Sequence, residues 1–481
     1  MSATSPYRQE KMFRSAALLG VILWGITTLF MLSGCSSGGA QTQSVSGKIT
    51  RGSSALAGVQ VTLSGSVSLT AITDAAGNFR FSNLPVGAYL LTPTFSGFTF
   101  TPASRSVWLN GIDGTAFDFT AYYPNHLAMS DHTMYLDGNA NLLGWGNNSD
   151  GQLGYAAGAS NPLPVQVAGL PAMAAVANGA SHTVALAADG TVWTWGSNNH
   201  GQLGDGSIIA SNIPRQVTSL NLVGITAVAA GSAHSVAVRY DGTVWAWGSN
   251  SNGQLGNNTI VDSTTPIQVL GVGGTGFMGV AKGIAAGHDH TVVHALDNTV
   301  WAWGSNSNGQ LGNNTTTDSH TPIQVTAAGG VAAIAAGDYH TAVLRKEVVD
   351  FKVWCWGKNS EGQLGDGTIV DHKTPVEVKD LTKVTTIAAG SNHTVAVLND
   401  GTVRAWGGNG SGQLGNGTVV SSSIPVTVSG LGSVLGIAAG NANTVALSLD
   451  NSVWSWGKND FGQLGDGSIT SSDVPVKAAL P

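Results

Sequence analysis

The tetrapeptide Gly-Gln-Leu-Gly occurs seven times along the chain, and this repetition constrains the fold more than any other feature of the sequence. The copies lie 50, 52, 56, 53, 50 and 50 residues apart. They begin at Gly151, Gly201, Gly253, Gly309, Gly362, Gly412 and Gly462. A period of this length indicates a tandem array, in which each unit stays incomplete until it stacks against its neighbours.

The sequence pattern of each unit predicts four short strands joined by tight turns. In one complete unit, an Ala-Ala-Gly strand at 387–390 precedes a His-Thr strand at 393–397, and Asp400-Gly401 then makes a hairpin turn. The Trp-Gly step at 406–407, the Gly-Gln-Leu-Gly segment and a Pro-Val segment complete the unit. A closed ring of such sheets protects their edges. The repetition therefore predicts an all-β, seven-bladed β-propeller.

Most units carry two tryptophans two positions apart after the hairpin turn, as at Trp193 and Trp195. Such side chains share one face of a strand. Each buried indole removes about 150–250 Å² from water, so rings packed between adjacent sheets would supply much of the core. Leu143 replaces the first tryptophan in the first unit, and Asn443 replaces the histidine in the seventh. Because the strand pattern is otherwise kept, we expect the ring to close.

The unit resembles the regulator of chromosome condensation repeat. The resemblance rests on the Ala-Ala-Gly strand, the His-Thr/Ser pair, the Trp-Gly step and Gly-Gln-Leu-Gly, and it covers residues 126–481. It implies a seven-bladed propeller, the usual number in that family, as the domain 123–481. It also implies a binding role, because known roles in the family include nucleotide exchange on a small GTPase and inhibition of a β-lactamase.

The N-terminal segment is expected to direct export. Basic residues between positions 8 and 14 precede the apolar stretch 15–32, which is the layout of a secretory signal peptide or, alternatively, of one membrane-spanning anchor. The sequence Leu-Ser-Gly-Cys, ending at Cys35, resembles a bacterial lipobox. That resemblance implies a lipoprotein signal peptide at 1–34 and lipidation of the Cys35 thiol.

Lipidation would anchor the protein to a membrane, because acyl chains contribute about 0.8 kcal/mol per buried methylene. The residue after Cys35 is Ser rather than Asp, which in such lipoproteins implies the outer membrane or the cell surface. Residues 35–44 are small and polar and are expected to form a flexible tether.

Residues 45–122 are expected to form a small β-sandwich. Short apolar runs such as 59–63, 79–81 and 89–93 predict strands, and a breaker cluster at 74–78 separates two of them. The domain resembles the carboxypeptidase regulatory-like and collagen-adhesin B-type families, which implies a stalk or spacer.

Some members of that wider group carry an isopeptide bond between Lys and Asn, assisted by a buried acid. Lys48 is the amine available here, with Asp118 or Asn110 as its partner. The domain contains no Glu to assist the reaction, so we do not expect the bond to form.

One histidine recurs at the same place in six units. These residues are His132, His182, His234, His290, His340 and His393. A ring of imidazoles around a central channel would be a candidate metal site, but metal sites usually need mixed ligands close together. We favour a structural histidine that hydrogen-bonds to backbone in each blade, because repeat geometry explains a repeated residue. No metal and no cofactor are expected.

Departures from the repeat are better functional clues, because stability does not require them. The connection at 271–280 is extended and carries an apolar tip, Phe277-Met278. The fifth unit has a lengthened hairpin that is the most charged run of the propeller, with Arg345, Lys346, Glu347, Asp350 and Lys352. We predict that these residues bind a partner. The alternative is harmless variation of surface loops.

Three polar loops are further candidates for a binding rim, at 257–264, 313–320 and 366–372. The acidic residues Asp205, Asp366 and Asp466 follow Gly-Gln-Leu-Gly in their units, where other units carry Asn. Asp and Asn both favour turns, so we expect turn residues rather than catalytic acids at this position.

Composition excludes several classes of function. The net charge is −7 and no long basic run follows residue 14, whereas a nucleic-acid partner requires a basic stripe. The Gly-Gln-Leu-Gly segments lack the Lys and the following helix of a phosphate-binding loop. Glu is nearly absent, and no Ser-His-Asp or Cys-His set stands out from the repeat.

We therefore expect a non-enzymatic, exported, lipid-anchored binding or scaffold protein whose propeller recognises a protein or a glycan. The alternatives are a structural envelope component, an inhibitor of an extracytoplasmic enzyme, a polysaccharide-active enzyme and a guanine nucleotide exchange factor. Exchange is disfavoured, because an exported protein meets no such GTPase and the propeller has no large wedge-like insertion. The sequence leaves the partner, the binding face and the oligomeric state open.

Overall fold

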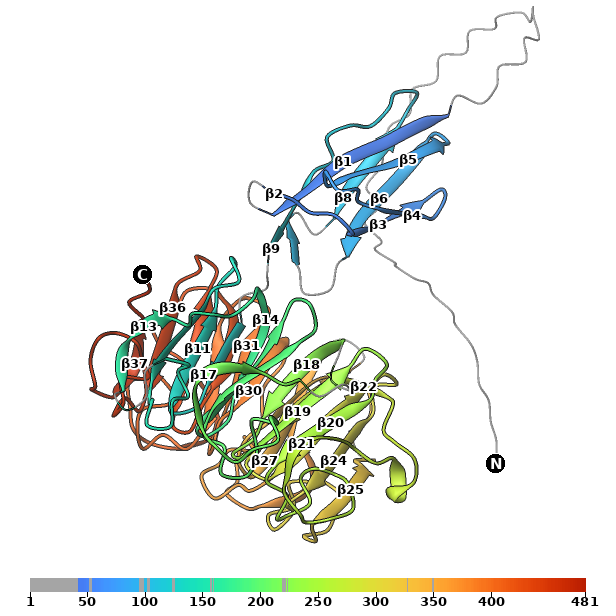
Figure 1. Cartoon of the computed structure of the whole chain (residues 1–481). Coiled ribbons are helices and arrows are strands. Elements are labelled where there is room, and N and C mark those ends of the chain that lie inside the picture. The colour runs from blue at the N-terminus through green and yellow to red at the C-terminus, as the bar shows by residue number, and fades with distance from the viewer. Residues whose placement is uncertain are drawn as a thin grey trace, which may run out of the picture.

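The computed structural model describes residues 42–51, 54–94, 99–101, 104–122, 126–155, 158, 160–218, 222, 224–326, 328–347 and 350–481. The expected signal peptide and Cys35 lie outside these residues. The chain forms a small β domain followed by a ring of seven sheets (Figure 1). No helix in the described part of the chain is long and apolar enough to cross a membrane.

The small domain is a sandwich of two sheets, as predicted. One sheet has the order β2-β1-β9-β7 with β5 also paired to β1, and the other has the order β4-β3-β6-β8. The strands are β1 (Gln43–Arg51), β2 (Ser54–Ala55), β3 (Gln60–Gly65), β4 (Leu69–Ile72), β5 (Asn78–Leu84), β6 (Gly87–Thr94), β7 (Thr99–Thr101), β8 (Arg105–Leu109) and β9 (Phe119–Tyr122). Alternate residues of β3, β5 and β6 point inward, and Val61, Phe79 and Leu91 are buried between the sheets.

The structure modifies the expected tether and places the residues considered for an isopeptide bond. Strand β1 starts at Gln43, inside the segment expected to be a tether, and Gln43 and Ser44 are buried. The side chains of Lys48 and Asp118 are exposed, and Asp118 Oδ1 accepts a hydrogen bond from the backbone N–H of Lys48 at 2.8 Å. This placement lacks the buried surroundings that an isopeptide bond requires.

Each repeat forms one four-stranded antiparallel sheet, numbered here as a blade. Blade 1 contains β10 (His126–Met129), β11 (His132–Leu136), β12 (Leu142–Gly146) and β13 (Asn161–Gln166), and blade 2 contains β14 (Met173–Asn178), β15 (His182–Ala187), β16 (Val192–Gly196) and β17 (Ser211–Gln216). Blade 3 contains β18 (Ile225–Ala230), β19 (His234–Arg239), β20 (Val244–Gly248) and β21 (Ser263–Gln268). Blade 4 contains β22 (Ala281–Ala286), β23 (His290–Ala295), β24 (Val300–Gly304) and β25 (Ser319–Gln324), preceded by the 3₁₀ turn η1 (Val272–Gly274).

The three remaining blades follow the same pattern. Blade 5 contains β26 (Val331–Ala336), β27 (His340–Lys346), β28 (Phe351–Gly357) and β29 (His372–Glu377). Blade 6 contains β30 (Val384–Ala389), β31 (His393–Leu398), β32 (Val403–Gly407) and β33 (Ser422–Thr427). Blade 7 contains β34 (Val434–Ala439), β35 (Asn443–Ser448), β36 (Val453–Gly457) and β37 (Ser472–Lys477). The first strands of neighbouring blades contact one another around the ring, so these strands are innermost.

The Trp-Gly step ends the third strand of every blade with a bulge. In blade 6 the pairing register shifts between Ala405 and Gly407, and Gly407 has a φ of 102°. A Cβ at this position would collide with the carbonyl of Asn392, so only glycine fits. The bulge turns the chain toward the next blade, where the Gly-Gln-Leu-Gly segment docks.

The two tryptophans of each pair differ in burial. The second one is fully buried in every blade, whereas the first is half-buried in most blades. Trp195 Nε1 donates a hydrogen bond to the Gln152 carbonyl of the preceding blade at 2.8 Å. The Gly-Gln-Leu-Gly segment of one blade is thus bound to the core tryptophan of the next.

The ring closes between blades 7 and 1 by this same contact. Trp145 Nε1 and Thr133 Oγ1 of blade 1 both donate to the Gln463 carbonyl of blade 7, at 3.0 and 2.9 Å. Strand β10 also contacts β34 and β35. Each described blade is built from one contiguous repeat, and a backbone hydrogen bond from the N–H of Gly467 to the Pro162 carbonyl adds to these contacts, so the ring closes between complete sheets and not through a shared strand.

Candidate functional site

The repeated histidines join neighbouring blades. His393 Nε2 lies 2.9 Å from Thr444 Oγ1 of the next blade, and that hydroxyl donates to the Gln413 carbonyl of blade 6 at 3.0 Å. Because the hydroxyl proton is used, the imidazole must donate from Nε2. The equivalent pairs are His132–Thr183, His182–Ser235, His234–Thr291, His290–Thr341 and His340–Thr394. The partner of each ring is therefore a side chain of the next blade, and not the backbone expected from the sequence.

Burial keeps these six imidazoles neutral. It lowers the pKa to about 3 for His132, His182, His290 and His340, and to about 4 for His234 and His393. All six are fully buried. No cluster of three or more His, Cys, Asp or Glu suited to a metal ion occurs among the described residues.

The seventh junction lacks this bond. Asn443 occupies the histidine position of blade 7, and both of its side-chain polar atoms are buried without a hydrogen-bond partner in the described structure. Thr133, the hydroxyl that faces this position from blade 1, still donates to Gln463. The junction between blades 7 and 1 therefore lacks the histidine–hydroxyl hydrogen bond that the other six junctions have.

A buried asparagine that follows the Trp-Gly step organises each long loop between the third and fourth strands. Asn359 Oδ1 accepts from the N–H of Leu364, and its Nδ2 donates to the carbonyls of Thr368 and Val370. Asp366 Oδ1 accepts from the N–H of Thr368 at 2.9 Å, which is a turn contact. The polar loops expected to form a binding rim are therefore held by their own hydrogen bonds.

Antiparallel strands give the propeller two different faces. The turns between first and second strands and the loops between third and fourth strands lie on one face, here named the mouth face. The turns between second and third strands and the connections between blades lie on the other, here named the hairpin face. The polar loops belong to the mouth face, whereas the 271–280 connection and the charged hairpin belong to the hairpin face.

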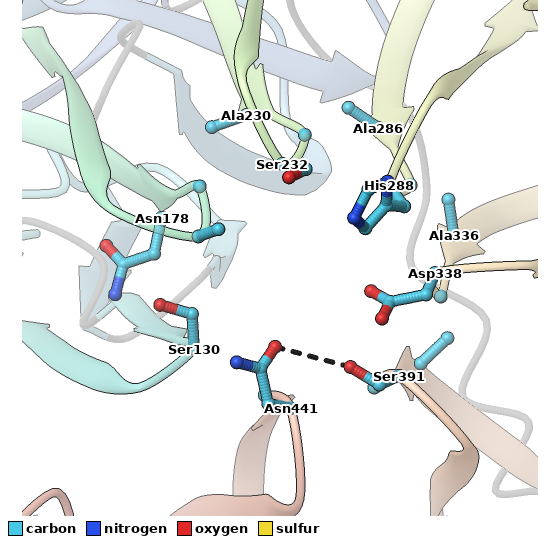
Figure 2. Close-up of a pocket in the computed structure, with 18 of the residues that line it drawn as sticks. Ser130, Asn178, Ala230, Ser232, Ala286, His288, Ala336, Asp338, Ser391 and Asn441 are labelled. Carbon is cyan, nitrogen blue, oxygen red and sulfur yellow. Dashed lines mark hydrogen bonds between the residues drawn. The ribbon is translucent and has the colours of Figure 1, made fainter. Parts of the chain in front are cut away.

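The central channel opens on the mouth face into a cavity of about 300 Å³ (Figure 2). Its wall is made mainly of alanines and glycines from the first strands. One residue per blade, two positions before the histidine position, rings the opening: Ser130, Ala180, Ser232, His288, Asp338, Ser391 and Asn441. The repeat does not fix the identity of this residue, and sequence analysis did not single it out.

Backbone hydrogen bonds and two charged residues define this ring. The N–H of Ser232 donates to the His288 carbonyl at 3.1 Å, and the N–H of His288 donates to the Asp338 carbonyl at 3.2 Å. Ser391 Oγ donates to Asn441 Oδ1 at 3.2 Å, as drawn in Figure 2. The loop backbone is therefore fixed from blade to blade while the side chains vary.

The charges at the mouth come from blades 4 and 5. His288 Nδ1 lies 2.8 Å from Asp289 Oδ2, and this hydrogen bond raises the pKa of His288. The imidazole of His288 also stacks on Tyr339 with the ring centroids 5.5 Å apart. Burial raises the pKa of Asp338, and the nearby Ser391 hydroxyl, His288 and Lys358 counter this in part.

On the hairpin face, the two residues of the predicted apolar tip, Phe277 and Met278, differ in exposure. Phe277 is 61% exposed, whereas Met278 is 4% exposed and packs in the core beside Trp303. Met278 was wrongly expected at the surface, because adjacent residues of an extended segment point to opposite sides. Phe277 alone is available to a partner.

Phe277 belongs to a wider apolar patch where blades 3 and 4 meet. The patch consists of Tyr240, Val272, Phe277, Val280 and Leu296, each between 44% and 69% exposed. Hydrogen bonds from the N–H of Ala281 to the Gly242 carbonyl and from the N–H of Leu296 to the Val280 carbonyl join the turn after Tyr240, Val280 and Leu296. Val272 and Phe277 belong to the connection that leads into Val280, and η1 contacts β25. Sequence analysis missed Tyr240 and Leu296, which stand beside the Asp-Gly and Asp-Asn turns.

The charged hairpin of blade 5 lies on the same face as the apolar patch. Arg345 Nε is 3.2 Å from Glu347 Oε1, and its guanidinium carbon is 4.9 Å from the ring centroid of Trp354. Lys352 pairs with Glu377. A hollow of about 400 Å³ is lined by Arg345, Glu347, Asp350, Lys352, Trp354, Glu377 and Thr382, whereas Lys346 is exposed outside it.

Comparison with known proteins agrees with this architecture. Residues 139–186, 189–238 and 241–294 match the Regulator of chromosome condensation (RCC1) repeat, and residues 271–480 match the RCC1-like domain. The chain belongs to the RCC1 repeat family. Residues 44–121 match the carboxypeptidase regulatory-like domain, so the resemblance of the small domain is confirmed.

Similar RCC1 propellers come from yeast, plants and humans. The crystal structure of Prp20p from Saccharomyces cerevisiae is 26% identical with a TM-score of 0.63, and the alignment covers 72% of this chain and 88% of Prp20p. Human WBSCR16 is 25% identical with a TM-score of 0.60, over 68% of this chain and 89% of WBSCR16. Prp20p is described with binding properties to Gsp1p and histones.

Curated relatives match a part of the propeller. The ultraviolet-B receptor UVR8 of Arabidopsis thaliana is 33% identical over 37% of this chain and 40% of the receptor. The probable E3 ubiquitin-protein ligase HERC6 of Homo sapiens is 37% identical over 37% of this chain and 18% of the ligase. The chain thus matches two fifths or less of these relatives. RCC1-like propellers are typical of protein-interaction scaffolds, and related ones bind protein partners.

Proposed function

We propose that this chain is an exported, lipid-anchored scaffold whose RCC1 propeller binds a protein partner through the hairpin face of blades 3 to 5. The observations that carry the proposal are the exposed apolar residues of blades 3 and 4 around Phe277 and the charged hairpin of blade 5 on the same face. Large groups of exposed apolar residues on soluble proteins often mark binding sites.

The composition of this surface favours a protein over a glycan. Tyr, Phe and Arg are enriched where proteins bind each other, and Arg239 lies 5.2 Å from the ring centroid of Tyr240 within the patch. The hairpin adds charges of both signs, which would orient a partner and exclude others. An apolar centre beside a charged border is the usual anatomy of a protein interface.

A non-enzymatic role is supported by how the candidate catalytic groups are used. The histidines donate between blades, Asp366 closes a turn, and the thiol of Cys355 is buried with its pKa raised by burial. A catalytic group must be free to reach a substrate. The ligase activity named for HERC6 belongs to a protein of which this chain matches 18%.

Export and anchoring are supported by the sequence of the first 35 residues. The lipobox-like Leu-Ser-Gly-Cys stands at the end of the apolar stretch, and the cysteine is one of two in the chain. Replacement Cys35→Ser should move the protein from the membrane fraction to the soluble exported fraction and abolish labelling by a radioactive fatty acid. Unchanged labelling would refute lipidation at Cys35.

The partner surface is tested by placing charged side chains in the apolar patch. The double variant Tyr240→Asp, Phe277→Asp should lose a partner that co-purifies with the full chain, because two carboxylates would stand in an apolar interface. Val420→Asp is the matched control, since Val420 is 71% exposed on the mouth face. Equal recovery of the partner with all three proteins, measured by quantitative mass spectrometry, would exclude this patch.

A further inference from the structure

We propose that the mouth of the channel is a second binding site, which takes an ammonium or guanidinium group against the Asp338 carboxylate. This site lies on the opposite face from the apolar patch and is independent of the partner proposed above. Two kinds of ligand carry such a group, namely a protein with an accessible Lys or Arg side chain and a free polyamine.

The cavity has the size and shape for such a group. Its volume of about 300 Å³ is at the small end of ligand sites, and its wall of alanine and glycine leaves the centre empty of side chains. Figure 2 shows Ser130, Ser232, His288, Asp338, Ser391 and Asn441 arranged around this space. Polar groups thus converge from six blades on one opening.

Asp338 supplies a carboxylate that has no ion-pair partner, although His288 and Lys358 attract it from farther away. No Lys, Arg or His nitrogen lies within 4 Å of its carboxylate in the described structure. His288 is paired with Asp289, and Lys358 Nζ lies over the Tyr339 ring, 5.4 Å from its centroid. A largely buried carboxylate without a cation is costly, and an incoming cation removes that cost.

Asn178 belongs to the wall on the other side of the cavity, and its amide does not point into the centre (Figure 2). Asn178 Oδ1 is buried and has no hydrogen-bond partner in the described structure, although its Nδ2 donates to the His132 carbonyl at 3.0 Å. The acceptor that faces the cavity is therefore the Asp338 carboxylate, which suits ammonium and guanidinium groups because they carry three and five N–H donors and no acceptor.

The test is isothermal titration of the full chain with N-acetyl-lysine-N′-methylamide, its arginine analogue and spermidine. We expect binding of at least one of these cations and none of the neutral analogue N-acetyl-norleucine-N′-methylamide. Binding of the amino-acid amides assigns the site to a protein side chain, and binding of spermidine alone assigns it to a polyamine. Failure of all three cations, or equal binding of the norleucine analogue, would overturn the proposal.

Variants distinguish cation binding at the mouth from nonspecific attraction of cations to the negatively charged protein. Asp338→Asn keeps the shape and should weaken cation binding at least tenfold, while Asn441→Asp adds a charge to the ring and should strengthen it severalfold. Asp460→Asn is the matched control, because Asp460 is an exposed carboxylate on the same face. If Asp338→Asn fails to fold, Asn441→Asp still tests the site. Equal affinity of wild type and both mouth variants would contradict the site, whatever the result for the apolar patch.

Discussion

Acid should unfold the propeller steeply, because six neutral histidines are buried at its blade junctions. Their ordinary pKa of 6.5 falls to about 3 or 4 in the folded state. The unfolded chain therefore binds more protons than the folded chain below pH 6.5. Through this linkage, the free energy of unfolding falls as the pH drops from about 6.5 toward the pKa values of the folded state. Above about pH 7.5 these histidines do not change the stability.

The magnitude follows from the difference in protonation. At pH 5.5 an unfolded histidine is about nine-tenths protonated while the buried one stays neutral, so each costs about 1.4 kcal/mol relative to pH 8. Six histidines together cost about 8 kcal/mol, which is comparable with the whole stability of a typical domain. The negative charge of Asp289 beside His234 and His290 reduces this figure somewhat.

The assay is urea unfolding followed by tryptophan fluorescence at a series of pH values between 8 and 5. His393→Asn should lower the slope of the unfolding free energy against pH by about 1.4 kcal/mol per unit, the amount due to one proton. Asn443→His should steepen the slope by the same amount. A slope that neither substitution changes, or a stability equal at pH 8 and pH 5.5, would refute the reasoning.

Three further predictions test the junctions and the buried thiol. Asn443→His should also raise stability at pH 8 by about 1 kcal/mol, measured by urea unfolding, because it restores a hydrogen bond to Thr133. Gly390→Ala should lower the melting temperature, at a cost of about 1–3 kcal/mol, because its Cβ would collide with the His393 ring and the Gly440 carbonyl. Cys355 should resist Ellman's reagent until urea unfolds the chain, because burial raises the pKa of its thiol.

The sequence predicts the propeller well because each signal is local to one repeat. The Asp400-Gly401 turn, the Trp-Gly bulge and the Gly-Gln-Leu-Gly segment each fix the chain within a few residues. In the small domain, strand β8 was missed although Val107 and Leu109 alternate with exposed neighbours. Strand β9 pairs in parallel with β1, about 70 residues earlier in the chain, and carries no local signal for that partner.

The candidate sites were less accessible to sequence analysis. Hydropathy marked Phe277 and Met278 together, but only the fold determines which of two adjacent side chains faces the core. The apolar patch joins Tyr240 to Leu296 through turns that are distant in the sequence. The mouth was detectable in principle, since the position of Asp338 varies among repeats that are otherwise alike. The loop around Asp338 has the same length as in the other repeats, so only the identity of one residue distinguishes it.

Because every blade is one uninterrupted repeat and the ring closes without a shared strand, the order in which the blades are synthesised is physically arbitrary. A circular permutant that links position 481 to 126 and opens the chain between blades 4 and 5 would keep all seven sheets and every junction. The same architecture lets whole repeats be gained or lost without breaking a sheet, at the cost of changing the diameter of the channel.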